Sequence, residues 1–335
     1  MNELITLIVP AYNIELWIEN CLYSIKNQTY RKLEIIVIND GSTDKTGKIC
    51  DQIAEMDDRI YVIHQENYGV GEARNIGIQL SHGKYICFVD GDDYLEPNYV
   101  DMLYQNIRIY DAQMSICDYQ EEYENGKLRR RLISDKKIGD ANNILNDLFF
   151  HDEIGRCLWN KMLIGTVIKE NNILFQKEYL VGEDMQFLIN YLKNISRVVF
   201  TNHIGYHYLW RDGSAMKKQQ WNKDYYNNRI SWIKAIKAIE KNLNDQKKVR
   251  NIFHHYKTLV YYRILCESTS FQANSKRKEY LEDILLHYVR KNGVQLIFSK
   301  MLTYKTAIGV FLCCISPKIQ VKMAKIGRFI NGRRA

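Results

Sequence analysis

The stretch Lys84-Tyr-Ile-Cys-Phe-Val-Asp-Gly-Asp-Asp-Tyr-Leu-Glu-Pro97 decides the fold of this chain. Its first part, Tyr85–Val89, is a short apolar run rich in aromatic and β-branched residues, which is typical of a fully buried strand. The run ends at Asp90-Gly-Asp-Asp93, where three carboxylates would repel one another without a cation among them. Because ligands bind at the carboxyl ends of strands in open α/β sheets, the stretch indicates a site for a metal ion and a diphosphate. The alternative is a turn followed by a helix N-cap.

The same alternation of strand and helix runs through the first 118 residues. Continuous apolar runs predict further strands at Leu4–Val9, Leu33–Ile38, Ile60–His64 and Met114–Cys117. Between the strands, apolar residues at helical spacing predict helices, and we expect Ser42 or Thr43 to cap the second of them. This order predicts an α/β fold with a Rossmann-like, mostly parallel sheet flanked by helices.

The pattern changes after Asp118. The charged segment Glu121–Lys137 is typical of an exposed loop or hairpin, and the pattern is helical from Trp221 to about Lys291. We therefore place a boundary near residue 217. It separates an α/β domain at residues 1–216 from an α-helical C-terminal region at residues 217–335.

The composition is that of an ordinary globular protein. Hydrophobic residues make up 46% and charged residues 26% of the 335 residues, and the net charge is +8. We expect no signal peptide, and no apolar run approaches the roughly 18 residues that span a bilayer. The eight cysteines lack the spacing of metal ligands and are typical of buried thiols in a cytosolic protein. These features predict a cytoplasmic location.

Polar residues follow the predicted strands, and all of them should lie at one edge of the sheet. They are Tyr12, Asn13, Asp40, Asn67, Asp90 and Asp92. A nucleotide fits this edge, because Tyr12 could stack on a base and Asp40 could accept a hydrogen bond from a uracil ring N–H. Arg74 could bind a phosphate through a charge-assisted bond. The plainer alternatives are a surface aromatic for Tyr12 and a turn residue for Asp40.

Two other nucleotide-binding motifs are excluded. Gly69-Val-Gly-Glu-Ala-Arg74 resembles the dinucleotide fingerprint, but Arg74 replaces its third glycine and the match follows the third strand, not the first. This argues against a Rossmann dehydrogenase. The chain also has no Gly-x4-Gly-Lys-Ser/Thr loop, which excludes a P-loop kinase or ATPase.

Four motifs, in this order and spacing, resemble family 2 glycosyltransferases of the GT-A fold. They are Ile8-Val-Pro-Ala-Tyr-Asn13, Ile38-Asn-Asp-Gly-Ser-Thr-Asp44, Asn67-x3-Gly-x2-Arg-Asn-x-Gly77 and Phe88-Val-Asp-Gly-Asp-Asp93. The resemblance implies a nucleotide-diphospho-sugar donor, usually UDP-linked, and a Mn²⁺ or Mg²⁺ ion held by Asp92. The donor-binding residues that it implies here are Pro10, Ala11, Tyr12, Asn13, Asp40, Asn67, Arg74, Asp90 and Gly91.

Three later segments are similar to the same family, though less tightly. They are Trp159-Asn-Lys161, before the acceptor site, the Glu-Asp motif Gly182-Glu-Asp184, and the mobile diphosphate loop Tyr206-His-Tyr-Leu-Trp-Arg-Asp-Gly-Ser214. The resemblance implies that Arg211 and Ser214 bind the donor. Inverting transfer needs a carboxylate that takes the proton of the acceptor hydroxyl, and we assign Asp184 to this role with Glu183 as the alternative.

Three of these assignments have structural alternatives. Glu183 and Asp184 could merely cap the helix that they begin. His207 could bind the metal, or it could be a packed histidine, since it stands between two tyrosines in the sequence. Lys161 could have a structural role.

The end of the chain is strongly basic. Asp283 is the last acidic residue, and ten basic residues follow it: Arg290, Lys291, Lys300, Lys305, Lys318, Lys322, Lys325, Arg328, Arg333 and Arg334. They surround the apolar segment Ala307–Ile315, which indicates an interfacial helix pair on an anionic leaflet. The alternative is a buried terminal helix with solvated basic flanks. Nucleic acid is not an expected partner, because no binding module accompanies these charges.

These features predict an inverting, metal-dependent glycosyltransferase that is peripheral on the cytoplasmic face of the membrane. By its resemblance to bacterial members of the family, it would act on a saccharide or lipid-linked saccharide in cell-surface polysaccharide synthesis. One alternative is a nucleotidyltransferase of related fold, although Pro10-Ala-Tyr-Asn13 stands where such an enzyme needs a Gly-rich, Arg-containing loop. The other is a non-catalytic sugar-binding homologue, against which Asp92, Asp184 and Arg211 argue.

Overall fold

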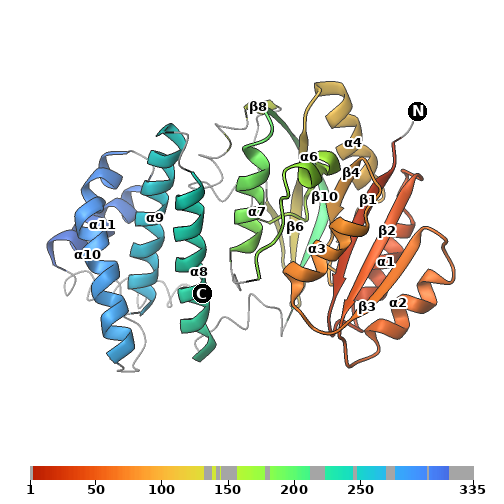
Figure 1. The fold of residues 1–335 in the computed structure, drawn as a ribbon, viewed down its shortest axis with the longest axis horizontal. Coiled ribbons are helices and arrows are strands. Elements are labelled where there is room, and N and C mark those ends of the chain that lie inside the picture. The colour runs from red at the N-terminus through yellow and green to blue at the C-terminus, as the bar shows by residue number, and fades with distance from the viewer. Residues whose placement is uncertain are drawn as a thin grey trace. The chain divides into compact units, whose positions relative to one another are not determined.

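The computed structural model describes residues 3–131, 138–140, 144, 157–177, 182–211, 223–243, 247–268, 276–299 and 302–316. The chain forms two compact units, residues 1–219 and 220–335 (Figure 1). In the first unit, helices flank a ten-stranded sheet, and the regular elements described in the second unit are helices. The predicted boundary between residues 216 and 217 lies outside the described residues.

Four parallel strands form the N-terminal half of the sheet. They are β1 (Ile5–Ala11), β2 (Leu33–Asp40), β3 (Ile60–Gln65) and β4 (Tyr85–Phe88), in the order β3-β2-β1-β4. All residues of β1, β2 and β4 are buried, which explains why their sequences are continuous apolar runs. The register sets Ile8 of β1 between Ile36 and Phe88. The predicted strands and their parallel arrangement are confirmed.

Further strands make the sheet mixed. They are β9 (Lys161–Ile164), β6 (Met114–Tyr123), β10 (Arg197–Trp210) and β5 (Tyr94–Leu95), which continue the order from β4, with β7 (Leu128–Arg131) on β6 and β8 (Ile138–Asp140) on β10. β9 runs antiparallel to β4 and β6, whereas β6 and β10 are parallel. The strands that alternate with helices are therefore parallel, as predicted, and β5, β7, β8 and β9 add antiparallel pairs. β6 and β7 form a hairpin within the segment where a loop or hairpin was predicted.

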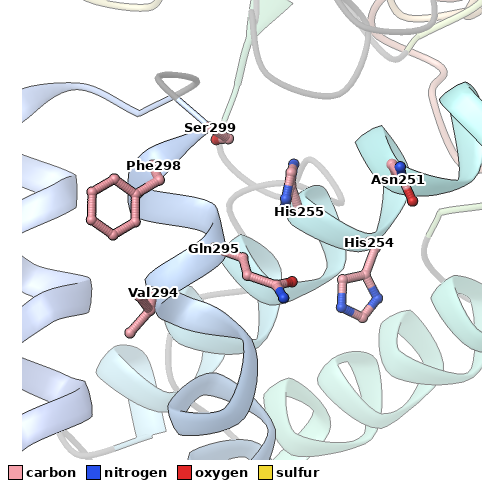
Figure 2. Close-up of a pocket in the computed structure, with 7 residues that line it drawn as sticks. All are labelled: Asn251, His254, His255, Val294, Gln295, Phe298 and Ser299. Carbon is pink, nitrogen blue, oxygen red and sulfur yellow. The ribbon is translucent and has the colours of Figure 1, made fainter.

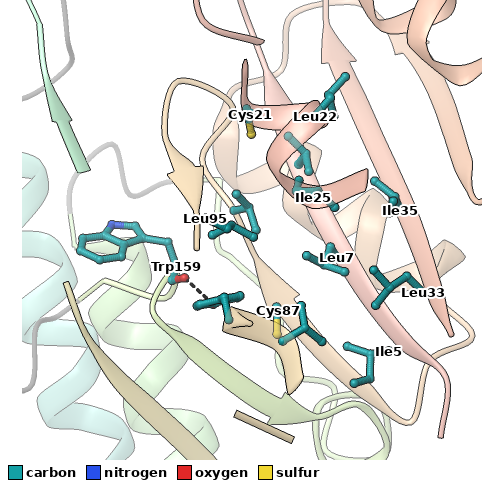
Figure 3. Close-up of a cluster of buried hydrophobic side chains, with 14 of the residues drawn as sticks. Ile5, Leu7, Cys21, Leu22, Ile25, Leu33, Ile35, Cys87, Leu95 and Trp159 are labelled. Carbon is teal, nitrogen blue, oxygen red and sulfur yellow. Dashed lines mark hydrogen bonds between the residues drawn. The ribbon is translucent and has the colours of Figure 1, made fainter. Parts of the chain in front are cut away.

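Helices cover both faces of the sheet. They are α1 (Ile18–Lys26), α2 (Thr46–Ala54), α3 (Val70–Leu80), α4 (Tyr99–Tyr110), α6 (Gly165–Glu170) and α7 (Glu183–Leu192). The larger core packs α1, α2 and α4 against one face, and Figure 3 shows Leu22 and Ile25 of α1 near Leu7 of β1. On the other face α3 packs through Gly77, where any Cβ would overlap Ile8. Leu7 and Ile8 are neighbours in β1 and contact helices on opposite faces of the sheet, because successive side chains of a strand point to opposite sides.

The prediction that Ser42 or its neighbour caps α2 is wrong. Lys45 is the N-cap residue and its side chain makes no capping bond, whereas Asp44 Oδ1 accepts a hydrogen bond from Thr46 N at 2.9 Å. Ser42 Oγ instead accepts a hydrogen bond from the backbone N–H of Asn13 at 3.1 Å. The loop after β2 is therefore tied to the loop after β1, at the edge where both strands end.

The second unit has four described helices. They are α8 (Lys223–Asn242), α9 (Lys247–Ser268), α10 (Lys276–Phe298) and α11 (Tyr304–Ile315), which confirms the predicted helical character of the C-terminal region in these ranges. A cavity of about 560 Å³ lies between α9 and α10, lined by Asn251, His254, His255, Val294, Gln295, Phe298 and Ser299 (Figure 2). No helix that the structure describes is both long enough and apolar enough to cross a membrane.

Candidate active site

The loops that follow β1, β2 and β4 meet at one edge of the sheet. Gly91, in the acidic turn after β4, lies against the end of β1: a Cβ there would be 3.0 Å from the carbonyl oxygen of Pro10 and 2.6 Å from Ile14 Cδ1. Gly41, after β2, lets Asn67 approach in the same way, since a Cβ there would be 2.7 Å from the Asn67 nitrogen. Glycine at these two positions therefore lets the loops after β1 and β4, and those after β2 and β3, approach closely at one edge.

Arg74 joins the acidic turn to the start of α7. Its Nη2 donates to Asp90 Oδ1 at 2.8 Å, and its Nη1 donates to Asp184 Oδ1 at 2.6 Å. The side chain is only 4% exposed, and its guanidinium lies 5.4 Å from the centroid of the Phe175 ring. Burial acts to lower the pKa of Arg74, but the charges of Asp184 and Asp90 outweigh it and raise that pKa. Arg74 therefore stays charged and holds two predicted site carboxylates together.

The two carboxylates at the start of α7 are poised to accept a proton. Gly182, in a left-handed conformation with φ of 92°, precedes them. Burial, together with the charge of Asp184, raises the pKa of Glu183 to about 7. Burial also raises the pKa of Asp184, against the opposing charge of Arg74. Partly buried carboxylates with raised pKa values are frequent among catalytic bases, so this pair suits the predicted role.

Replacing Arg74 with Met is expected to destabilise the fold by about 3 kcal/mol near pH 7, because the change leaves two partly buried carboxylates without a counter-charge. Without Arg74 the pKa of Asp184 should rise further above its unfolded value. A carboxyl group whose pKa is raised by folding lowers the stability of the folded state as pH rises through that pKa. The destabilisation caused by Arg74→Met should therefore become smaller as pH falls toward about 4.5, where Asp184 is protonated in the folded variant. Urea unfolding of both proteins at the two pH values measures this, and an equal loss at both would contradict it.

Asp92, the predicted metal ligand, is paired with Arg211 in this structure. Arg211 donates to Asp92 Oδ2 from Nε at 2.8 Å and from Nη2 at 2.5 Å. Its guanidinium also lies 4.2 Å from the centroid of the Trp17 ring. Burial and the charge of Asp90 raise the pKa of Asp92, and Arg211 opposes that rise. The carboxylate therefore needs a cation beside it, and Arg211 supplies one here.

Asp93 has no assigned role in the sequence-based prediction, yet it fixes the acidic turn. Its Oδ2 accepts a hydrogen bond from Tyr206 Oη at 2.7 Å and its Oδ1 accepts one from Leu209 N at 2.9 Å. Tyr206 Oη in turn accepts a bond from the backbone N–H of Asp90 at 3.1 Å. Burial, together with its acidic neighbours, raises the pKa of Asp93 well above its ordinary value. Asp93 thus links the turn to β10, the strand that leads to Arg211.

Asp40, predicted to bind a base, also fixes the loop between β3 and α3. Its Oδ1 accepts hydrogen bonds from Gln65 Nε2 at 2.6 Å and from Tyr68 N at 2.9 Å. Its Oδ2 accepts a bond from Gly69 N at 2.8 Å. Each carboxylate oxygen has two acceptor positions, so one position remains at Oδ2 of this side chain, which is 3% exposed.

The other predicted donor-binding residues lie at the same edge or outside the described part of the chain. Pro10 and Ala11 are the buried last residues of β1, and Tyr12 after them is 48% exposed. Asn13 Oδ1 accepts a hydrogen bond at 2.8 Å from a backbone N–H in the loop after β2. Ser214 lies outside the described residues, so its role stays a prediction.

His207 is held by residues other than Asp92. Its Nδ1 lies 2.8 Å from Glu122 Oε1, its Nε2 lies 2.8 Å from Glu96 Oε1, and its ring stacks on Tyr94 with centroids 4.3 Å apart. Both ring nitrogens are thus engaged, as the packed alternative for this histidine requires. Its role as a metal ligand stays a prediction.

Lys161, the first residue of β9, has contacts that suit a structural role. It is fully buried, and burial lowers its pKa. Its Nζ donates to the carbonyl oxygen of Cys157 and to Asn160 Oδ1, each at 2.7 Å. These bonds fix the segment that leads into β9, the strand between β4 and β6.

The carboxylates of the acidic turn fit a divalent cation that also binds phosphate. Among the described residues, no group of three His, Cys, Asp or Glu side chains converges on a common metal position. Mn²⁺ and Mg²⁺ do not need such a group, since they are often held by one or two carboxylates plus substrate phosphates. Asp92, whose pKa is raised by burial and by the charge of Asp90, supplies the kind of oxygen that such an ion prefers. The donor set therefore suits the predicted ion.

Solved structures share this fold over almost the whole chain. TarS of S. aureus, solved in complex with UDP-GlcNAc, superimposes with a TM-score of 0.73 over 99% of this chain and 92% of that one, at 17% identity. The mannosyltransferase PcManGT of Pyrobaculum calidifontis, solved with GDP-Man and Mn²⁺, gives a TM-score of 0.54 over 97% and 85% of the two chains, at 14% identity. The mixed sheet with its flanking helices is the GT-A fold of glycosyltransferases.

Sequence comparisons match the first part of the chain to one family. The model described as Glycosyl transferase family 2 matches residues 6–165. The glycosyltransferase GlyA of Streptococcus pneumoniae serotype 4 is 35% identical over 235 residues, which are 65% of this chain but only 32% of GlyA. The uncharacterized glycosyltransferase YibD of Escherichia coli (strain K12) is 27% identical over 317 residues, 92% of this chain and 91% of YibD. Residues 6–165 belong to glycosyl transferase family 2, and this match argues against the nucleotidyltransferase alternative.

Proposed function

We propose that this protein is an inverting, metal-dependent glycosyltransferase that moves one sugar from a UDP-sugar to a saccharide or lipid-linked saccharide in cell-surface polysaccharide synthesis. The observation that carries the proposal is the bridge from Asp90 through Arg74 to Asp184. Arg74 and Asp184 are 110 positions apart in the sequence. One buried side chain therefore links the turn where a donor sugar would lie to a carboxylate that can take a proton from an acceptor.

The nucleotide would lie along the edge formed by β1 and β2. The half-exposed ring of Tyr12 offers a face on which a base could stack. Asp40, at the end of the neighbouring strand, has a remaining acceptor position for a uracil N–H. TarS, whose fold this chain shares, was solved with UDP-GlcNAc, which favours a uridine nucleotide here.

The diphosphate would lie beside Asp92 and Arg211. A Mn²⁺ or Mg²⁺ ion bound by Asp92 would offset the negative charge that develops on the departing diphosphate. Arg211 must leave Asp92 Oδ2 to make that position available, and its guanidinium could then pair with the phosphate oxygens as a charge-assisted fork. The same arginine would thus neutralise Asp92 before the donor binds and the diphosphate afterwards.

Asp184 would act as the base. In one in-line step the acceptor oxygen attacks the anomeric carbon, the bond from that carbon to the diphosphate breaks, and the acceptor proton moves to the carboxylate. Arg74 bonds only one oxygen of Asp184, so it orients the group and leaves Oδ2 for the proton. Because the nucleophile and the leaving group lie on opposite faces of the sugar, its anomeric configuration inverts.

A screen of nucleotide-sugars tests the proposed donor. We expect UDP-sugars with Mn²⁺ to raise the melting temperature, since a ligand at a hundred times its Kd stabilises a fold by about 2.7 kcal/mol. GDP- and CMP-sugars, measured under the same conditions, are the controls. Slow release of UDP from one UDP-sugar would then identify the sugar. Stabilisation by GDP- or CMP-sugars alone would refute the uridine assignment, and no response to any nucleotide-sugar would favour the non-catalytic alternative.

A further inference from the structure

Helix α11 has an apolar face that the structure leaves exposed. Four large side chains lie along it: Tyr304 is 82% exposed, Ile308 41%, Phe311 52% and Ile315 61%. They are separated by four, three and four positions, the spacing that places side chains on one side of a helix. Isolated exposed apolar residues need no explanation, but a row of four on one helix face marks an interaction surface.

The opposite side of α11 is packed tightly within its unit. Gly309 lies directly against Tyr262 of α9, and a Cβ on Gly293 of α10 would be only 2.7 Å from Cys314 Sγ. The side chain of Thr303 caps the helix by accepting a hydrogen bond from a backbone N–H three residues on. Because the glycine contacts leave no room for larger side chains, the helix cannot turn its exposed face inward.

Positive charge is concentrated around this helix in the sequence. Residues 284–335 contain ten Lys or Arg and no Asp or Glu, so the positive charge of this segment exceeds the net charge of +8 of the whole chain. Three of these cations, Arg290, Lys291 and Lys305, are described and exposed. Lys305 belongs to α11 itself and follows Tyr304, the first residue of the exposed row. The exposed apolar row therefore has a described cation at its N-terminal end.

We infer that α11 docks through this apolar face onto the surface of a membrane that contains anionic lipids. Aromatic and aliphatic side chains on one side, with Lys and Arg around them, are the pattern of helices that lie in the interface plane. The helix has 12 residues, so it is about 18 Å long and too short to span a hydrocarbon core of about 30 Å. The helix therefore lies along the surface with its side chains inserted, while the cations bind lipid phosphates.

A second copy of the chain fits this surface less well. In a two-fold dimer the same patch meets itself, so Lys305 would approach its own copy with no acidic residue of 284–335 to balance it. A leaflet rich in anionic lipid instead supplies the missing negative charge. The charge pattern therefore selects a lipid surface over self-association.

Sedimentation with lipid vesicles tests the inference. The full chain should bind vesicles of phosphatidylcholine with about one third phosphatidylglycerol, bind pure phosphatidylcholine poorly, and dissociate as salt rises from about 0.1 M to about 0.5 M. The double variant Phe311→Ser, Ile315→Ser should lose at least about tenfold in vesicle partitioning, because two apolar side chains no longer insert. The matched control is Ile109→Ser, Leu128→Ser, which changes two apolar residues of the first unit that are at least half exposed, as Phe311 and Ile315 are, and should partition like the wild type.

Two measurements keep the test decisive. Melting temperatures should be unchanged in both double variants, since all four residues are exposed. Equal binding to neutral and anionic vesicles, or equal loss in the control, would overturn the inference. So would a change from dimer to monomer in sedimentation velocity with unchanged vesicle binding, since the face would then join two copies. No donor is present in these assays, so their outcome is independent of the proposed sugar transfer.

Discussion

Replacing Asp184 with Asn is expected to slow sugar transfer by roughly 10²–10⁴-fold, the usual contribution of a general base. The amide cannot take the proton of the acceptor hydroxyl. Its oxygen can still accept the bond that Arg74 Nη1 now donates to Asp184 Oδ1 at 2.6 Å, so the local geometry should survive. Binding of UDP, measured by calorimetry with Mn²⁺ present, should therefore change little while turnover is lost.

Glu183→Gln is the matched variant for this test, because Glu183 is the other carboxylate at the start of α7. Burial and the charge of Asp184 raise the pKa of Glu183 to about 7. A base must be ionised to act, so if Glu183 were the base, the kcat/KM of the wild type would rise with pH through about 7. With Asp184 as the base, E183Q should keep most of its activity. Loss of transfer in E183Q, with normal transfer in D184N, would move the assignment to Glu183.

Strands β1, β2 and β4 of the parallel half were predictable because they are buried on both faces. Leu33–Ile38 and Leu4–Val9 are almost uninterrupted apolar runs, and only a central strand of a covered sheet requires such a sequence. The polar residues that end these strands could be placed at one edge for the same reason, since parallel strands share a direction. The part of the site built on these strand ends therefore followed from local pattern alone.

The contacts between distant segments were not predictable in this way. Arg211 and Asp92 are 119 positions apart, and no local pattern shows that the guanidinium rests on Asp92 and on the Trp17 ring. Trp17 lies at helical spacing with apolar residues, which is typical of a core residue. Asp93 did carry a signal, because a third carboxylate in four residues needs a partner, but that partner, Tyr206, is 113 positions away. Such pairings depend on the tertiary fold.

Replacing Asp92 with Asn is expected to abolish metal-dependent transfer, with a loss of at least about a thousandfold. The charge stabilisation that a bound metal gives a departing diphosphate is worth several kcal/mol, which corresponds to that factor. The variant should remain folded, because it removes a carboxylate whose pKa burial and Asp90 already raise. Transfer rates during a Mn²⁺ titration and the melting temperature measure the two effects. If turnover by the variant still depended on Mn²⁺, Asp92 would not be a ligand of the metal.

Arg211→Met should affect metal binding in the opposite direction. Arg211 donates two hydrogen bonds to Asp92 Oδ2, so an ion that binds this oxygen without nucleotide must displace them. We expect this variant to bind Mn²⁺ about fivefold more tightly in the absence of nucleotide, the factor that corresponds to an ion pair worth about 1 kcal/mol. Its transfer activity should nevertheless fall, since the diphosphate loses a cationic partner. Arg59→Met, which removes a guanidinium paired with Asp57, should change neither quantity. Equal or weaker Mn²⁺ binding by Arg211→Met would show that Arg211 and the metal do not compete for Asp92.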